Sequence, residues 1–256
     1  TAVAVHAEES ADLWSLEPLS RQAPPDVPDG DWANNPLDRF IYARMRKAGV
    51  EPGGEASKQS LLRRVTFDLT GLPPTPAEIS RFLEDDSKDP FARLVDRLLE
   101  TRAYGERWGR HWLDVARYAD SNGLDENIAY IQAWRYRDWV IDSFNRDKPY
   151  DEFLRAQVAG DLLQSPDPES DYEDKVATGF LSIGPKMLAE DDGRKMELDI
   201  VDEQVDTVGR VFMGLTLGCA RCHDHKFDPV STRDYYSMAS IFKSTKTMEN
   251  FNVVAV

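Results

Sequence analysis

Cysteine and histidine are scarce in this chain, and basic residues are fewer than acidic ones. The 256 residues include two cysteines and four histidines, which excludes a disulfide-rich scaffold. Lysine and arginine number 31 against 46 aspartates and glutamates, so the net charge is −15. Because nucleic-acid binding relies on clustered cations that neutralise phosphates, this composition argues against a nucleic-acid partner.

Long apolar runs and alternating patterns are also missing. No apolar run approaches the roughly 20 residues that cross a bilayer, which predicts that the chain has no membrane span. The sequence also lacks a convincing alternation of apolar and polar residues, the pattern of a half-buried strand. Hydrophobic residues make up 41% and charged residues 30%, as expected of a folded globular chain. The composition and patterning therefore predict a mainly α fold.

The chain is predicted to consist of an N-terminal arm and one helical domain. Residues 1–7 end in Val-His-Ala, which fits the small-residue pattern that closes an export signal. Residues 8–33 are rich in Pro, Asp and Glu, as in an extended segment. We interpret residues 1–33 as a signal remnant and an extended arm, with a merely flexible end as the alternative. Residues 34–256 are predicted to form a single α-helical domain.

Helix start and stop signals recur through this domain. Asn-Pro and Gly bound a predicted helix over residues 35–49, and a capping box opens another over 75–85. We expect a polar loop over 164–174 and an irregular segment over 184–195. An apolar stripe at steps of three and four then predicts one long helix over 197–217. The remaining helices are predicted over residues 58–69, 90–101, 105–119, 130–145, 150–163 and 231–242.

One short motif carries chemistry. Gly218 is expected to end the long helix, and Cys219-Ala-Arg-Cys222-His223 follows, a Cys-x-x-Cys-His sequence typical of c-type haem attachment. Two thiols at this spacing can reach the two vinyl groups of a porphyrin, and the next residue presents an imidazole to the iron. We therefore expect haem c to be bound covalently by Cys219 and Cys222, with His223 as an iron ligand. The helical domain would wrap around this site.

Other uses of the cysteine pair stay open. Zinc could take Cys219, Cys222, His223 and His225, although structural zinc sites usually combine two separated ligand pairs. A thioredoxin-like redox pair would need a βαβ context, which the helical pattern opposes. A structural disulfide between residues three apart would be strained and uncommon.

The second axial ligand of the iron is expected on the helix predicted over 105–119. This helix contains Arg110-His111-Trp112, and we take His111 as the candidate sixth ligand, with a hydrogen-bonded core histidine as the alternative. Arg110 belongs to a set of arginines interleaved with aromatic residues, which could hold haem propionates or form surface ion pairs.

Methionines compete with His111 for the iron. Met187 and Met196 lie in or beside the segment expected to be irregular, where a loop methionine could approach a haem. Met213 follows Phe212 on the predicted long helix, so we expect it only to pack. Met238 and Met248 are further candidates, and the site could also stay open.

Long stretches of the chain resemble the second planctomycete cytochrome-c-type domain family. The resemblance covers about residues 34–243 and implies a secreted bacterial protein that is one part of a longer chain, with an adjacent cytochrome-like domain. It implies a haem role for Cys219, Cys222 and His223 and carries the Arg-His-Trp motif over to residues 110–112. The similar stretches include Asn35–Ile41, Phe67–Pro76, Tyr104–Asp114, Ala116–Ser121, Ala133–Asp138, Phe144–Tyr150 and Gly214–Pro229.

Three functions follow as hypotheses. The first is electron transfer in an exported, periplasmic or extracellular redox chain, with a redox partner protein or an adjacent cytochrome domain. The second is a haem enzyme, peroxidase-like or substrate-oxidising and possibly linked to polysaccharide breakdown, which needs an open sixth position. The third is a structural module that is held together by haem or metal. Of the three, we favour the electron carrier as the expectation.

Overall fold

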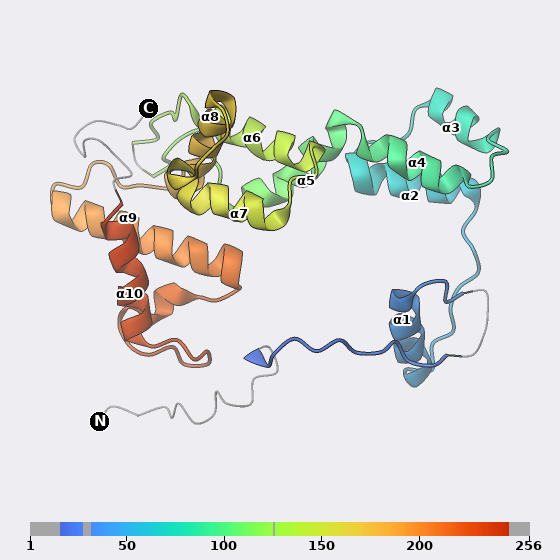
Figure 1. The fold of residues 1–256 in the computed structure, drawn as a ribbon, viewed down its shortest axis with the longest axis horizontal. Coiled ribbons are helices and arrows are strands. Elements are labelled where there is room, and N and C mark those ends of the chain that lie inside the picture. The colour runs from blue at the N-terminus through green and yellow to red at the C-terminus, as the bar shows by residue number, and fades with distance from the viewer. Residues whose placement is uncertain (1–15, 28–31, 125, 246–256) are drawn as a thin grey trace. The chain divides into compact units, whose positions relative to one another are not determined.

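The computed structural model describes residues 16–27, 32–124 and 126–245. The signal remnant interpreted over residues 1–7 and the candidate ligand Met248 lie outside these ranges. The chain divides into two compact units, one within residues 6–61 and the other from Leu62 onward. The described residues contain ten α-helices and no strand beyond an isolated bridge between Ser121 and Ala129, which confirms the mainly α fold (Figure 1).

The unit within residues 6–61 contains α1 (Pro36–Lys47). Asn35 caps this helix by accepting a hydrogen bond from the Asp38 amide, and the Asp38 carboxylate accepts from the Asn35 amide in return. Gly49 follows the helix with a φ of +67°, a conformation that favours glycine. These local signals confirm the helix predicted over 35–49.

The second unit begins within α2 (Lys58–Thr70), and its first helices form a small apolar cluster of their own. These helices are α2, α3 (Pro76–Leu83) and α4 (Pro90–Leu99). The predicted capping box between Thr75 and Glu78 is present at the start of α3. Side chains from all three helices meet in the buried cluster of Leu62, Phe82, Leu94 and Leu98.

The main core of the second unit starts from a close pair of helices, α5 (Arg102–Val115) and α6 (Ala133–Asn145), which lie along one another (Figure 1). Gly105 and Gly109 are the buried residues of α5 and face α6. A Cβ atom on Gly105 would come within 2.5 Å of the Ile141 carbonyl oxygen and of the Asn145 side chain. The pair therefore packs this closely because Gly105 has no side chain.

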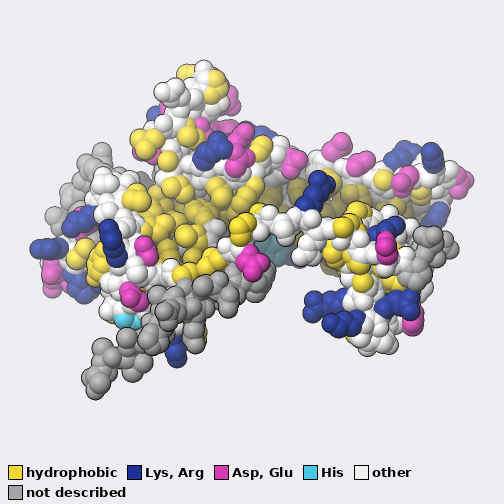
Figure 2. Space-filling view, turned by 60° about the horizontal axis from the view of Figure 1, so that its bottom comes forward, with side chains coloured by type: hydrophobic (Ala, Val, Ile, Leu, Met, Phe, Trp, Pro, Cys, Tyr) yellow, Lys and Arg dark blue, Asp and Glu magenta, His cyan; other side chains and the backbone are white. Residues whose placement is uncertain are grey.

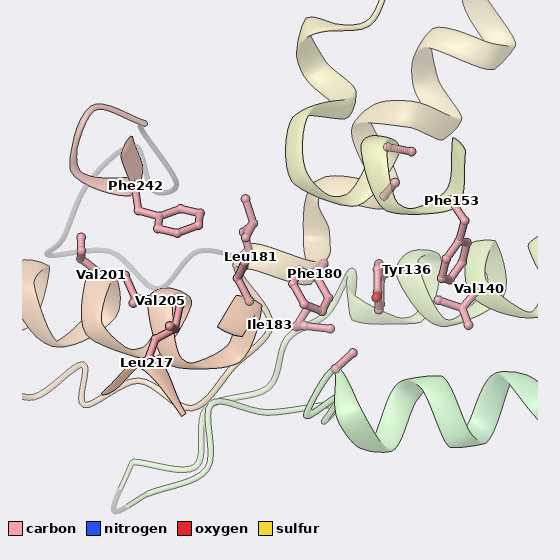
Figure 3. Packing of buried hydrophobic residues seen from close by; sticks show 14 of the residues in the cluster. Tyr136, Val140, Phe153, Phe180, Leu181, Ile183, Val201, Val205, Leu217 and Phe242 are labelled. Carbon is pink, nitrogen blue, oxygen red and sulfur yellow. The ribbon is translucent and has the colours of Figure 1, made fainter. Parts of the chain in front are cut away.

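Aromatic rings fill the space between this pair and the following helices, α7 (Tyr150–Ala159) and α8 (Pro168–Ala177), and the short turns η3 (Gly160–Leu162) and η4 (Thr178–Leu181) (Figure 3). The Phe153 ring lies 4.8 Å from Trp112 and 5.0 Å from Trp139. Gln157 is fully buried among them and accepts hydrogen bonds from Trp112 Nε1 at 2.8 Å and the Tyr136 hydroxyl at 2.5 Å. Gln157 thus satisfies the polar atoms of Trp112 and Tyr136, whereas the buried Trp139 Nε1 has no hydrogen-bond partner among the described residues.

The C-terminal elements are α9 (Gly193–Val208), the π-helical turn η5 (Gly209–Met213), the 3-10 turn η6 (Leu217–Arg221) and α10 (Thr232–Lys243). The helix predicted over 197–217 is therefore confirmed as far as Met213, with a π-helical last turn, and is wrong only at its end. Gly214 adopts a φ of +66° and ends the helical run, whereas Gly218 was expected to end it and instead lies within η6. The apolar stripe continued past this break because Leu215 and Leu217 still pack on the core.

The polar loop predicted over 164–174 was also wrong, because α8 occupies its second half. Asp167 accepts hydrogen bonds from the amides of Glu169 and Ser170, and Pro168 takes the first helical position. Lys175 pairs with Asp171 one turn earlier at 2.6 Å. These end signals outweigh the weak apolar pattern. No helix among the described residues is long and apolar enough to cross a membrane.

The packing of α5 on α6 gives a first prediction. Gly105→Ala should lower the free energy of unfolding by about 1–3 kcal/mol, because the new methyl group overlaps the Ile141 carbonyl and forces the helices apart. Urea denaturation measures the change. The matched control is Gly193→Ala in the first turn of α9, where a Cβ meets nothing within 4 Å and stability should stay level or rise slightly. Equal effects of the two substitutions would contradict the packing argument.

Candidate functional site

The cysteine motif forms the turn η6 and the residues that follow it. Leu217 and Ala220 are buried and attach this turn to the core. Cys219 and Cys222 are exposed and carry free thiols, and His223 is exposed beside them. The turn therefore keeps its apolar side chains inward and presents the three reactive side chains to solvent.

Two glycines allow the motif to lie directly on α9 and η5. A Cβ on Gly209 would come within 2.6 Å of Leu217 Cγ, and a Cβ on Gly218 within 2.9 Å of Asp206 Oδ1. Neither glycine needs a positive φ, so close approach is the reason for both. The backbone of η6 is thereby held against the end of α9.

An ion pair fixes the middle of the motif. Arg221, between the two cysteines, donates to Asp202 Oδ2 on α9 at 2.9 Å. The Asp202 charge raises the pKa of Arg221, which stays protonated. Tyr235 on α10 donates its hydroxyl hydrogen to the other Asp202 oxygen, and the Tyr236 hydroxyl donates to the Arg221 carbonyl at 3.3 Å. Sequence reasoning missed Asp202 and Tyr235, since nothing in their local sequence shows that they meet the motif.

One ring nitrogen of His223, Nδ1, forms a hydrogen bond, and no hydrogen bond is described for the other, Nε2. Its Nδ1 lies 2.7 Å from the Asp224 carbonyl oxygen, so Nδ1 carries the hydrogen and donates it. This tautomer leaves the Nε2 lone pair available to a ligand. The Asp224 carboxylate accepts from the Thr232 amide at 2.8 Å and so joins this segment to the start of α10.

His225 is structural by contrast. Its side chain is only 8% exposed, and its Nε2 lies 3.0 Å from the Thr216 hydroxyl. Its Nδ1 accepts from the amides of Phe227 at 3.3 Å and Asp228 at 2.8 Å. Because Nδ1 accepts, the hydrogen is on Nε2 and donates to Thr216, and the nearby Asp228 carboxylate does not receive it. Both nitrogens of His225 therefore hold the loop after the motif.

The four side chains proposed for zinc are not assembled. Within the part of the chain that the structure describes, no three His, Cys, Asp or Glu side chains form a group that could hold a metal ion. Both His225 nitrogens already have partners. The geometry of this loop therefore does not favour a tetrahedral site of Cys219, Cys222, His223 and His225.

The Arg110-His111-Trp112 motif divides between surface and core. Trp112 is half-buried, and its ring stacks on Phe212 of η5 with centroids 6.1 Å apart. Arg110 and His111 are exposed, and the His111 ring lies 5.4 Å from the Trp108 ring. The described contacts thus bring Trp112, rather than His111, against the segment that leads to the cysteines.

The candidate methionines differ in how deeply they are buried. Met196 was expected at the edge of an irregular segment but lies inside α9, buried against Ile200 and Leu188. Met187 is 39% exposed, and Met213, expected only to pack, is 53% exposed. Met238 is half-buried against the main core. Burial in a packed cluster makes Met196 a poor candidate for an iron ligand.

A helical fold that presents an exposed Cys-x-x-Cys-His segment defines the class of this protein. Its sequence matches the model of the PSCyt2 family, described as "Protein of unknown function (DUF1549)", over residues 36–247. The chain belongs to this family, as the sequence resemblance predicted. No curated protein and no solved structure gives a match.

The unlike surroundings of the two histidines give a second prediction. His225→Ala should lower the free energy of unfolding by about 1–3 kcal/mol, because two backbone amides lose their acceptor. His223→Ala should change it by less than about 0.5 kcal/mol, because the exposed ring holds only one local carbonyl. Chemical denaturation of the purified variants measures both. A larger loss for His223→Ala would contradict the assignment of His225 as structural.

Proposed function

We propose that this chain is an exported c-type haem protein that carries electrons. Cys219 and Cys222 would hold haem c through two thioether bonds, and His223 Nε2 would bind its iron. One observation supports this most: both thiols are free and exposed on one turn, next to an imidazole whose Nδ1 is held by a carbonyl. When bound, haem supplies an iron that changes its oxidation state by one electron.

The residues around the motif fit such a group. The hydrogen bond to the Asp224 carbonyl orients the His223 ring and raises its basicity as a ligand. The Arg221–Asp202 ion pair and the buried Ala220 hold the backbone between the two cysteines. The chain can thus keep both thiols and the imidazole in place while the cofactor face stays accessible.

Exposed apolar side chains near the motif also support the proposal. Met213 is 53%, Phe227 74% and Tyr236 57% exposed. Each is close to the motif in sequence or in contact with it, since Phe227 packs on His225 and Tyr236 bonds to Arg221. Exposed apolar side chains of this kind mark surfaces that a ligand or a partner covers, and a porphyrin is a large apolar ligand. Hydrophobic side chains also gather on the face drawn in Figure 2, which does not place the motif.

His111 is proposed as the sixth iron ligand, and a redox protein or an adjacent cytochrome domain as the partner. The neighbouring Trp112 stacks on Phe212, so α5 packs against the segment that leads to Cys219. His111 itself is exposed, as a side chain available to a ligand must be. The net charge of −15 would favour a partner with a cationic surface.

Covalent attachment is the third prediction. The chain, exported together with a haem-attachment machinery, should keep its haem through acid–acetone extraction and gain the mass of one haem. Cys219→Ala and Cys222→Ala should each leave at most one thioether bond, and the double variant none. Ala159→Ser at the end of α7 serves as an expression control. Two free thiols and no added mass in the exported wild-type protein would refute haem attachment.

The sixth ligand gives a fourth prediction. His111→Ala should convert six-coordinate low-spin iron to a high-spin form, and His111→Met should raise the reduction potential, since Met/His ligation raises it. Optical spectra and potentiometry measure these changes. The matched control is Met187→Ala, which removes an exposed methionine and should leave the spectrum unchanged. If His111→Ala and His111→Met both keep the wild-type spectrum, the His111 assignment is wrong. High-spin iron in the wild-type protein would favour the haem enzyme.

A further inference from the structure

A cavity of about 300 Å³ lies in the second unit, away from the cysteine motif in sequence. Its wall is formed by the start of α6, the end of α8, the turn η4 and the segment up to Leu188. The volume is at the small end of the range found for ligand pockets. Its lining residues include the aromatic and aliphatic side chains of Tyr130, Ala133, Tyr136, Val176, Ile183 and Leu188.

The charged lining residues of this cavity are all cations. They are Arg135, Lys175 and Lys186, and no aspartate or glutamate lines the wall. This is unexpected in a chain of net charge −15. Lys175 is paired with Asp171, but Arg135 bonds to the neutral side chains of Gln132 and Tyr172. The cavity therefore carries uncompensated positive charge.

Lys186 is the most unusual of the three. It is 5% exposed, and its Nζ donates to the carbonyl oxygens of Ser182 and Gly184, with the Tyr130 ring centroid 5.6 Å away. These partners are neutral, so the ammonium has no carboxylate in direct contact among the described bonds. Burying such a charge is costly unless it is paired. The two carbonyl oxygens and the Tyr130 ring stabilise this ammonium, and an anion in the cavity would add the opposite charge that its direct partners lack.

Two charged side chains, Arg117 and Glu203, act on Lys186, and their effects on its pKa oppose each other. Arg117 and Glu203 form a bidentate ion pair next to Gly184. Burial lowers the pKa of Lys186 to about 8, and the opposing effects of Glu203 and Arg117 are smaller. The ammonium therefore keeps its charge at neutral pH and can meet an anion that enters the cavity.

We propose that this cavity binds a small organic carboxylate whose apolar body contacts Tyr130, Tyr136 and Ile183 while its carboxylate contacts Lys186 and Arg135. The cationic lining selects the charge, and the apolar walls favour a ring or branched chain over a fully hydrated ion such as phosphate. This proposal is independent of haem attachment, because none of its residues belongs to the cysteine motif.

Benzoate is the probe, with neutral benzamide of the same shape as the matched ligand. Titration of the full chain followed by NMR should show that benzoate binds at least tenfold more tightly than benzamide, with shifts at residues that line the cavity. Lys186→Met, which keeps the length of the side chain, should weaken benzoate at least tenfold. Lys88→Met, on an exposed loop, should leave the affinity unchanged.

Arg135→Met covers the case in which Lys186→Met fails to fold, since Arg135 is only half-buried. It should weaken benzoate at least threefold and leave benzamide unchanged. Equal affinity for benzoate and benzamide, no measurable benzoate binding, or wild-type benzoate affinity in either cavity variant would each overturn the proposal. Loss of haem in the cysteine variants would leave benzoate binding intact, so the two proposals fail separately.

Discussion

The ion pair between Arg117 and Glu203 joins the two halves of the main core. Arg117 follows α5 with a φ of +48°, a strained conformation for a residue with a side chain. Its guanidinium donates to Glu203 Oε2 at 2.8 Å and to the Phe180 carbonyl at 2.7 Å. The pair thus ties the end of α5 to the middle of α9 and to η4. Because both side chains are largely buried, loss of either partner would leave a charge in the core.

Helix α9 contributes one ion pair near each of the two proposed sites. Glu203 anchors Arg117 beside the Lys186 cavity, and the preceding residue, Asp202, anchors Arg221 within the cysteine motif. Successive residues on a helix point about 100° apart, so one helix can serve two neighbouring surfaces. The same helix therefore bears the carboxylate that holds the cysteine turn and the carboxylate that pairs with Arg117 near the cavity, although no residue of α9 lines the cavity.

The two sites also differ in the charges that surround them, although the chain as a whole is acidic. The cysteine motif presents two free thiols and an imidazole on an exposed turn, which the Arg221–Asp202 ion pair holds to α9. The cavity keeps three cations together and leaves the carboxylates outside its wall. A cationic redox partner would be attracted to the acidic surface, whereas a small carboxylate would be drawn to the cations that line the cavity. The two proposals thus place opposite electrostatic demands on different parts of one fold.

Local signals in the sequence determined most of the helices and the motif itself. Asn35, Thr75 and Ser231 cap helices through hydrogen bonds within a few residues, and short-range bonds of this kind can be predicted from sequence. The spacing of Cys219, Cys222 and His223 is likewise a property of five consecutive residues. The helix at 168–177 was missed because its end signals surround a stretch with little apolar pattern.

Only the tertiary structure decided which side chains meet over long separations. The break at Gly214, the partnership of Arg221 with Asp202, and the structural role of His225 depend on packing between α9, η6 and the loop that follows. The cavity around Lys186 joins residues from 130 to 188, and no local pattern marks them as neighbours. The sequence determined the reactive groups and most helices because these depend on nearby residues. The surroundings of those groups depend on contacts between distant ones, which the folded chain alone establishes.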